Sequence, residues 1–94
     1  MIASMAVSRL PKAVMRMTVE LALGHEVKKG REALHKSQED LAFEAGIHRT
    51  YVSMIERGKK SPTLAVIVRL ANALNIKPSE LLQRMEVKLE QADI

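Results

Sequence analysis

The chain has 94 residues and a formal net charge of +4; 47% of its residues are apolar, with one Phe, one Tyr, no Trp and no Cys. This length allows one domain whose core must be aliphatic, which favours helices over sheet. The absence of cysteine excludes disulfides and thiolate metal sites, and no apolar run approaches the roughly 20 residues that cross a bilayer. Because residues 1–10 also lack the apolar region of a signal peptide, we expect a cytoplasmic protein.

Helix-boundary signals and apolar spacing predict five helices joined by short loops. The predicted helices cover residues 19–34, 38–45, 49–57 and 64–74, and a last one begins at residue 78. Leu23, Val27 and Leu34 form the apolar stripe of the first. Ser37 and Asp40 resemble a capping box at the start of the second, and Gly46 ends it with the positive φ of a tight turn.

These elements define the domain organisation. Residues 1–18 form an N-terminal extension, mixed apolar and basic, in which any helix starts after Pro11, at about Lys12. Residues 19–90 form the folded all-α domain, and residues 91–94 are a short C-terminal tail.

The positive charge is concentrated in one segment. Residues 37–47 carry three carboxylates and no base, which gives −3, whereas residues 48–62 carry four bases and one acid, which gives +3. A surface that binds a polyanion needs such a concentration of bases. A mildly basic domain can also be merely soluble, so the charge alone does not decide the function.

The predicted helix 49–57 has a polar face suited to DNA. At 100° per residue, one arc of about 140° collects side chains that can contact base edges or phosphates: Arg49, Thr50, Ser53, Met54 and Arg57. Val52 and Ile55 lie on the opposite, apolar arc. Arginine can bond to guanine at two points, hydroxyls to several base edges, and an apolar tip can contact a thymine methyl. An ordinary amphipathic surface helix would show the same division.

The residues around this helix favour DNA binding. Gln38 begins the preceding helix, where free backbone N–H groups and the helix dipole attract phosphate. Lys59 and Lys60 follow the helix and offer two ammonium groups to the DNA backbone. Two short helices, a glycine turn and flanking phosphate-binding groups together predict a helix-turn-helix.

Residues between positions 23 and 82 also match a known pattern. The matching residues are Leu23-Gly24, Val27, Arg31, Ser37 to Ala42, Gly46, Tyr51 to Gly58, Pro62, and Leu70-Ala71 through Leu74. On these residues the chain resembles the phage-repressor-like (Xre, or lambda-repressor-like) helix-turn-helix family. Arg49-Thr50-Tyr51, with Ile55-Glu56-Arg57 after it, looks most like controller proteins of restriction–modification systems and small repressors.

The resemblance implies a five-helix lambda-repressor-like fold and a role for each site residue. The base-contacting residues would be Arg49, Thr50, Ser53 and Met54, and the phosphate-contacting residues Gln38, Tyr51, Arg57, Lys59 and Lys60. Tyr51 stays undecided, because the helical wheel places it at the edge of the core. The resemblance also implies a structural ion pair between Arg31 and Glu56.

Some positions depart from the family pattern. Gly30 and Lys36 stand where the family usually has apolar residues, so the end of the first helix is expected to pack differently. His48 replaces the usual Ser, Thr or Asp N-cap, and a neutral imidazole there would cap only weakly. The spacing of His25, His35 and His48 is not that of metal ligands, so no metal is expected.

A single helix-turn-helix contacts too few base pairs for strong discrimination, so we expect a homodimer. The helix 64–74 is apolar almost all round, with Ala65, Val66 and Val68 among its outward positions. The predicted interface combines Val66 with residues of the last helix, namely Leu82, Met85 and Leu89. Alternatively, residues 1–18 cover this apolar surface within one chain.

The sequence therefore predicts a DNA-binding transcriptional regulator that occupies a pseudo-palindromic operator as a dimer. The alternative is a protein-interaction module or an antitoxin component with the same fold. An enzyme is not expected, because the chain lacks a catalytic triad, a phosphate-binding glycine loop and the length for a usual substrate cleft. We expect double-stranded DNA and a second copy as partners, and no cofactor, small-molecule ligand or membrane.

Overall fold

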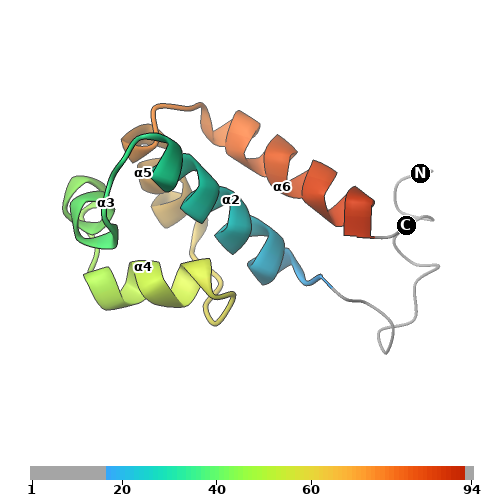
Figure 1. Ribbon diagram of the computed structural model, residues 1–94, viewed down its shortest axis with the longest axis horizontal. Coiled ribbons are helices and arrows are strands. Elements are labelled where there is room, and N and C mark those ends of the chain that lie inside the picture. The colour runs from blue at the N-terminus through green and yellow to red at the C-terminus, as the bar shows by residue number, and fades with distance from the viewer. Residues whose placement is uncertain (1–16, 93–94) are drawn as a thin grey trace.

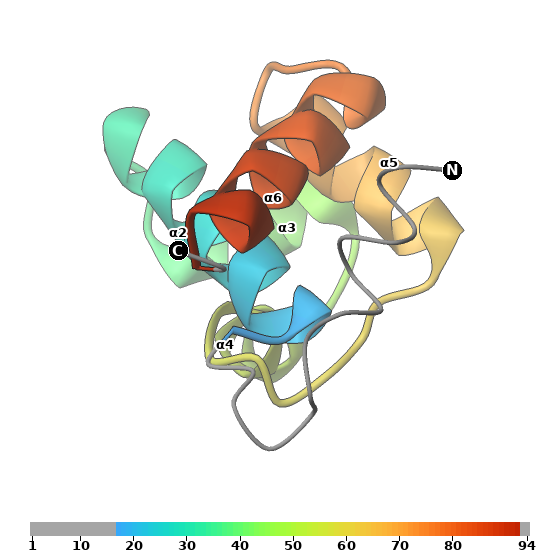
Figure 2. The same cartoon turned by 90° about the vertical axis from the view of Figure 1, so that its right-hand side faces the viewer.

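The computed structural model describes residues 17–92 (Figures 1 and 2). This part consists of five α-helices without strands: α2 (Val19–Ala33), α3 (Gln38–Ala45), α4 (Arg49–Glu56), α5 (Leu64–Ala73) and α6 (Pro78–Ala92). The predicted all-α, five-helix fold is confirmed. The expected helix from about Lys12 lies outside the described residues. None of the five helices is long and apolar enough to cross a membrane.

Local side chains explain where the helices begin. Ser37 Oγ accepts a hydrogen bond from the Asp40 backbone N–H (2.9 Å), and Asp40 Oδ2 accepts one from the Ser37 backbone N–H (3.0 Å). The predicted capping box is thus present, and the Ser37 N–H lowers the pKa of the Asp40 carboxyl. Thr18 and Thr63 cap α2 and α5, because their hydroxyl oxygens accept hydrogen bonds from the backbone N–H groups of Leu21 and Val66. His48 differs from the expectation, because its side chain makes no capping hydrogen bond to α4.

The helix α2 runs through the middle of the fold, with α6 packed on one side and α4 on the other (Figure 1). The largest fully buried side chains come from all five helices and form one core: Leu41, Ile55, Leu70, Leu81, Val27 and Val52. Leu34 was predicted to continue the apolar stripe of α2, but it follows the last helical residue and is exposed. The stripe ends at Val27 for this reason.

The orientation of α5 corrects one prediction. Val66 was expected to face outward at a dimer interface, but its side chain is only 7% exposed and belongs to the core. It lies four residues before the buried Leu70, so both point to the same side of the helix. The outward face of α5 carries Leu64, Ala65 and Val68 instead. On α6, Leu82, Met85 and Leu89 are each partly buried.

Candidate nucleic-acid interface

The helices α3 and α4 form the predicted two-helix unit. Gly46, in the left-handed conformation with φ of 70°, ends α3 and reverses the chain toward α4. Such a φ favours glycine because a Cβ atom would be strained there. The short connection Gly46-Ile47-His48 fixes the angle between the two helices and leaves one face of α4 outward.

The polar and apolar faces of α4 are separated in the structure. Val52 and Ile55 are completely buried, whereas Arg49 and Thr50 are exposed. Ser53 and Met54 on the same helix are half-buried. The four candidate base-contacting residues therefore share one accessible surface. Arg49 and Thr50, at the start of α4, are its most exposed members.

The surface at the end of α4 is cationic. Arg57, Lys59 and Lys60 are exposed, and the Nε of Arg57 donates to the Ser53 carbonyl oxygen at 3.3 Å. Glu56 is the single acidic residue between positions 48 and 62, and it is buried. With Arg49, this segment presents four exposed cations and no exposed carboxylate. Its accessible charge is thus one unit more positive than the sequence count of +3.

Glu56 is held by two residues that come from other helices. Arg31 of α2 donates from Nε to Oε2 at 2.7 Å and from Nη2 to Oε1 at 3.0 Å. The ion pair between Arg31 and Glu56 is thus part of the structure, and the hydrogen bond to Glu56 raises the pKa of Arg31. Gln38 of α3 donates from Nε2 to the same Oε1 at 3.0 Å. The hydrogen bond from Gln38 was not predicted, because nothing in the sequence signals it.

Two further candidates lie where the core meets the surface. Tyr51 is partly buried and packs against the core cluster. This position agrees with the helical wheel, which placed Tyr51 at the edge of the core.

Lys36 departs from the family pattern for a reason that the structure makes clear. Its Nζ donates to Glu44 Oε1 at 2.5 Å and to the Ala73 carbonyl oxygen at 2.8 Å, so it ties α3 to the end of α5.

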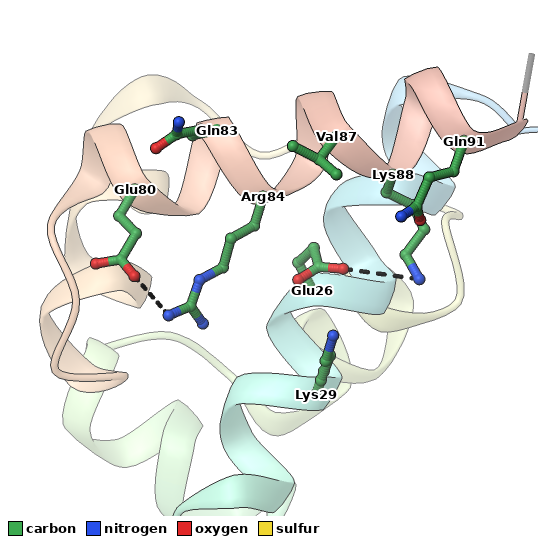
Figure 3. Close-up of a pocket in the computed structure, with 8 residues that line it drawn as sticks. All are labelled: Glu26, Lys29, Glu80, Gln83, Arg84, Val87, Lys88 and Gln91. Carbon is green, nitrogen blue, oxygen red and sulfur yellow. Dashed lines mark hydrogen bonds and ion pairs between the residues drawn. The ribbon is translucent and has the colours of Figure 1, made fainter.

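A groove of about 410 Å³ lies between α2 and α6, whereas α4 packs on the other side of α2 (Figures 1 and 3). Its lining carries both signs of charge, from Lys29, Arg84, Lys88, Glu26 and Glu80 (Figure 3). The buried Glu26 carboxylate faces Lys88 Nζ at 3.8 Å, and Glu80 pairs with Arg84. This mixture lacks the uniform positive charge of the α4 surface. Within residues 17–92 no group of three His, Cys, Asp or Glu side chains could hold a metal ion.

Comparison with known proteins decides the family. The family model described as helix-turn-helix matches residues 27–81, more than half of the chain. The chain belongs to the helix-turn-helix family. The match covers α3, α4 and α5 completely, together with α2 from Val27 onward and the start of α6.

Several members of the family resemble this chain over most of their length. The control protein C.SmaI of Serratia marcescens is 39% identical over 75 residues, which is 80% of this chain and 89% of that protein. The control protein C.BamHI of Bacillus amyloliquefaciens is 41% identical over 69 residues, 72% of this chain and 85% of that protein. The crystal structure of the restriction–modification controller protein C.AhdI from Aeromonas hydrophila shares 42% identity and a TM-score of 0.65, over 66% of this chain and 94% of that chain. The predicted resemblance to controller proteins is confirmed.

Proposed function

We propose that this helix-turn-helix transcriptional regulator binds a pseudo-palindromic DNA operator as a homodimer, with α4 in the major groove. The observation that carries this proposal is the exposed surface of α4 and the loop after it. Four cations, Arg49, Arg57, Lys59 and Lys60, are accessible there without a competing exposed carboxylate. Such a surface attracts a polyanion, and a helix of this diameter fits the major groove.

Each candidate contact has a place on this surface. Arg49, Thr50, Ser53 and Met54 would contact base edges. Gln38, Arg57, Lys59 and Lys60 would contact phosphates on either side, which fixes the register of the helix on the duplex. Tyr51 packs against the core, and its hydroxyl is the remaining candidate for a phosphate contact.

Two copies would pair through the outward face of α5 and the partly buried apolar residues of α6. Leu64 is 69% exposed, and Ala65 and Val68 are exposed beside it, so this apolar face is left uncovered by the rest of residues 17–92. Leu82 and Leu89 would extend the interface along α6. A two-fold dimer reads two half-sites about 34–36 Å apart.

Selection of binding sites from random DNA tests the proposal directly. The enriched sequence should contain two inverted half-sites, and affinity for it should fall steeply with salt concentration. Arg49→Ala should weaken binding by about 1–3 kcal/mol and relax the preference at one base pair. Lys59→Ala should weaken binding to all sequences and reduce the salt slope by about 1. Lys29→Ala, in the groove between α2 and α6, is the matched control and should change neither quantity.

A protein-interaction role, including that of an antitoxin component, is the second candidate. The observation that favours it is Phe43, whose side chain is 87% exposed on α3. In that case the double variant Arg49→Ala with Lys59→Ala would keep its protein partner, and no selected DNA would bind the wild type. The relatives are named as control or controller proteins. We propose that this chain has no catalytic activity and acts in the cytoplasm.

A further inference from the structure

We propose that Glu56 is a positioning residue that fixes the orientation of the Gln38 carboxamide, so that Gln38 presents an N–H donor to a DNA phosphate. This inference rests on the proposed function. Glu56 is the last residue of α4, with a side chain that is 3% exposed, and Gln38 is the first residue of α3. The two residues therefore join the ends of the two helices that face the DNA.

The hydrogen bond between them has only one chemically consistent direction. A carboxylate accepts hydrogen bonds and has none to donate, so the Gln38 amide must point its Nε2 at Glu56. Exchanging the two ends of the amide would place the Gln38 oxygen about 3 Å from Glu56 Oε1, where two acceptors repel. With Nε2 held at 3.0 Å, its second N–H has no partner among the described residues. A phosphate oxygen is the acceptor that this N–H suits.

Arg31 makes this arrangement compatible with DNA. A carboxylate without a counter-ion next to Gln38 would repel a phosphate, but the two hydrogen bonds from Arg31 neutralise Glu56. The Nη1 of Arg31 also donates to the Lys36 carbonyl oxygen at 2.7 Å, just before Ser37 caps α3. One guanidinium thus holds the backbone that leads into α3, while Glu56 holds the side chain of its first residue.

A double-mutant cycle on DNA affinity tests the coupling. Glu56→Gln keeps the shape and an acceptor oxygen, but its amide can also donate, so it no longer dictates the orientation of Gln38. In the wild type, Gln38→Ala should weaken binding to the selected operator by about tenfold or more, the cost of a hydrogen bond to a charged group. In the Glu56→Gln background the same change should weaken binding by less than about threefold.

Lys60→Ala is the internal control, because Lys60 makes no hydrogen bond or ion pair to Glu56. It should weaken binding by the same factor in both backgrounds. An equal loss for Gln38→Ala in both backgrounds would overturn the positioning role while leaving DNA binding intact. A wild type that enriches no DNA sequence would instead overturn the proposed function.

A measurement on the wild type covers the case in which Glu56→Gln does not fold. In the DNA-free protein, NMR relaxation should give the Gln38 side-chain amide an order parameter near the value of about 0.85 found for rigid backbone. The exposed Gln83 side chain serves as the flexible reference in the same spectrum. A Gln38 amide as mobile as that of Gln83 would overturn the inference.

Discussion

The guanidinium of Arg31 and the carboxylate of Glu56 form a two-point ion pair that joins α2 to the last turn of α4. Their side chains are 11% and 3% exposed, so both charges are largely removed from water. Such a pair is retained only where hydrogen bonds satisfy the charged groups, and Glu56 has three of them, from Arg31 twice and from Gln38. The orientation of the α4 surface therefore depends on a residue of α2.

Arg31→Met should lower the free energy of unfolding by about 3–5 kcal/mol, because it leaves the buried Glu56 charge without its counter-ion. Urea denaturation checks this value. The control is Arg84→Met, which breaks the pair with Glu80 at 2.5 Å, where both side chains are more than 40% exposed. That change should cost no more than about 0.5 kcal/mol. An equal loss of unfolding free energy in the two variants would show that the buried pair of Arg31 stabilises the fold no more than an exposed pair.

Gly24→Ala should destabilise the protein and displace α4, because a Cβ at residue 24 would lie 2.3 Å from the Ile55 carbonyl oxygen. That oxygen is backbone, so the helices themselves must separate. Gly30→Ala is a matched control in the same helix, since the atoms nearest to its Cβ would be the Leu74 methyl groups, at an ordinary contact distance of 3.5 Å. It should raise stability by about 0.5–1 kcal/mol through the better helix propensity of Ala. Melting temperatures of the two variants should move in opposite directions.

Asp40 should make the stability of the protein depend on pH in the acidic range. Its pKa is lowered in the fold, first by the hydrogen bond from the Ser37 backbone N–H and then by the Ser37 side chain. A carboxyl with a depressed pKa stabilises the fold above its ordinary value of 3.8, and this stabilisation is lost as the pH falls through the lower folded-state pKa. Asp40→Asn should flatten the dependence of unfolding free energy on pH below about pH 4. If the unfolding free energy of Asp40→Asn depended on pH below about pH 4 as steeply as that of the wild type, the capping box would not contribute to this pH dependence.

Leu64→Lys should weaken self-association without unfolding the chain, because Leu64 is exposed on the apolar face of α5. Sedimentation at micromolar concentrations should show a shift toward the 10.5 kDa species. Phe43→Lys is the control: Phe43 is even more exposed but lies on α3, so its replacement should leave the dimer unchanged. A wild type that sediments only as a monomer would refute the proposed dimer.

Local signals in the sequence were sufficient for the helices and for the faces of α4. The capping box at Ser37 and the positive φ at Gly46 involve residues within a few positions of each other, so they can be predicted without knowledge of the fold. The helical spacing of apolar residues along positions 49–57 likewise predicted that Val52 and Ile55 are buried. The helix-turn-helix fold was predictable for this reason.

Only the tertiary structure decided which way α5 faces and what surrounds Glu56. A helix that is apolar almost all round has no preferred inner face in its sequence, and packing against α3 and α6 turned Val66 inward. The hydrogen bond from Gln38 to Glu56 spans 18 positions and three residues of different helices meet there, which no local pattern encodes. The sequence thus determined which helices form and what they carry, whereas long-range packing determined how those side chains are held toward a partner.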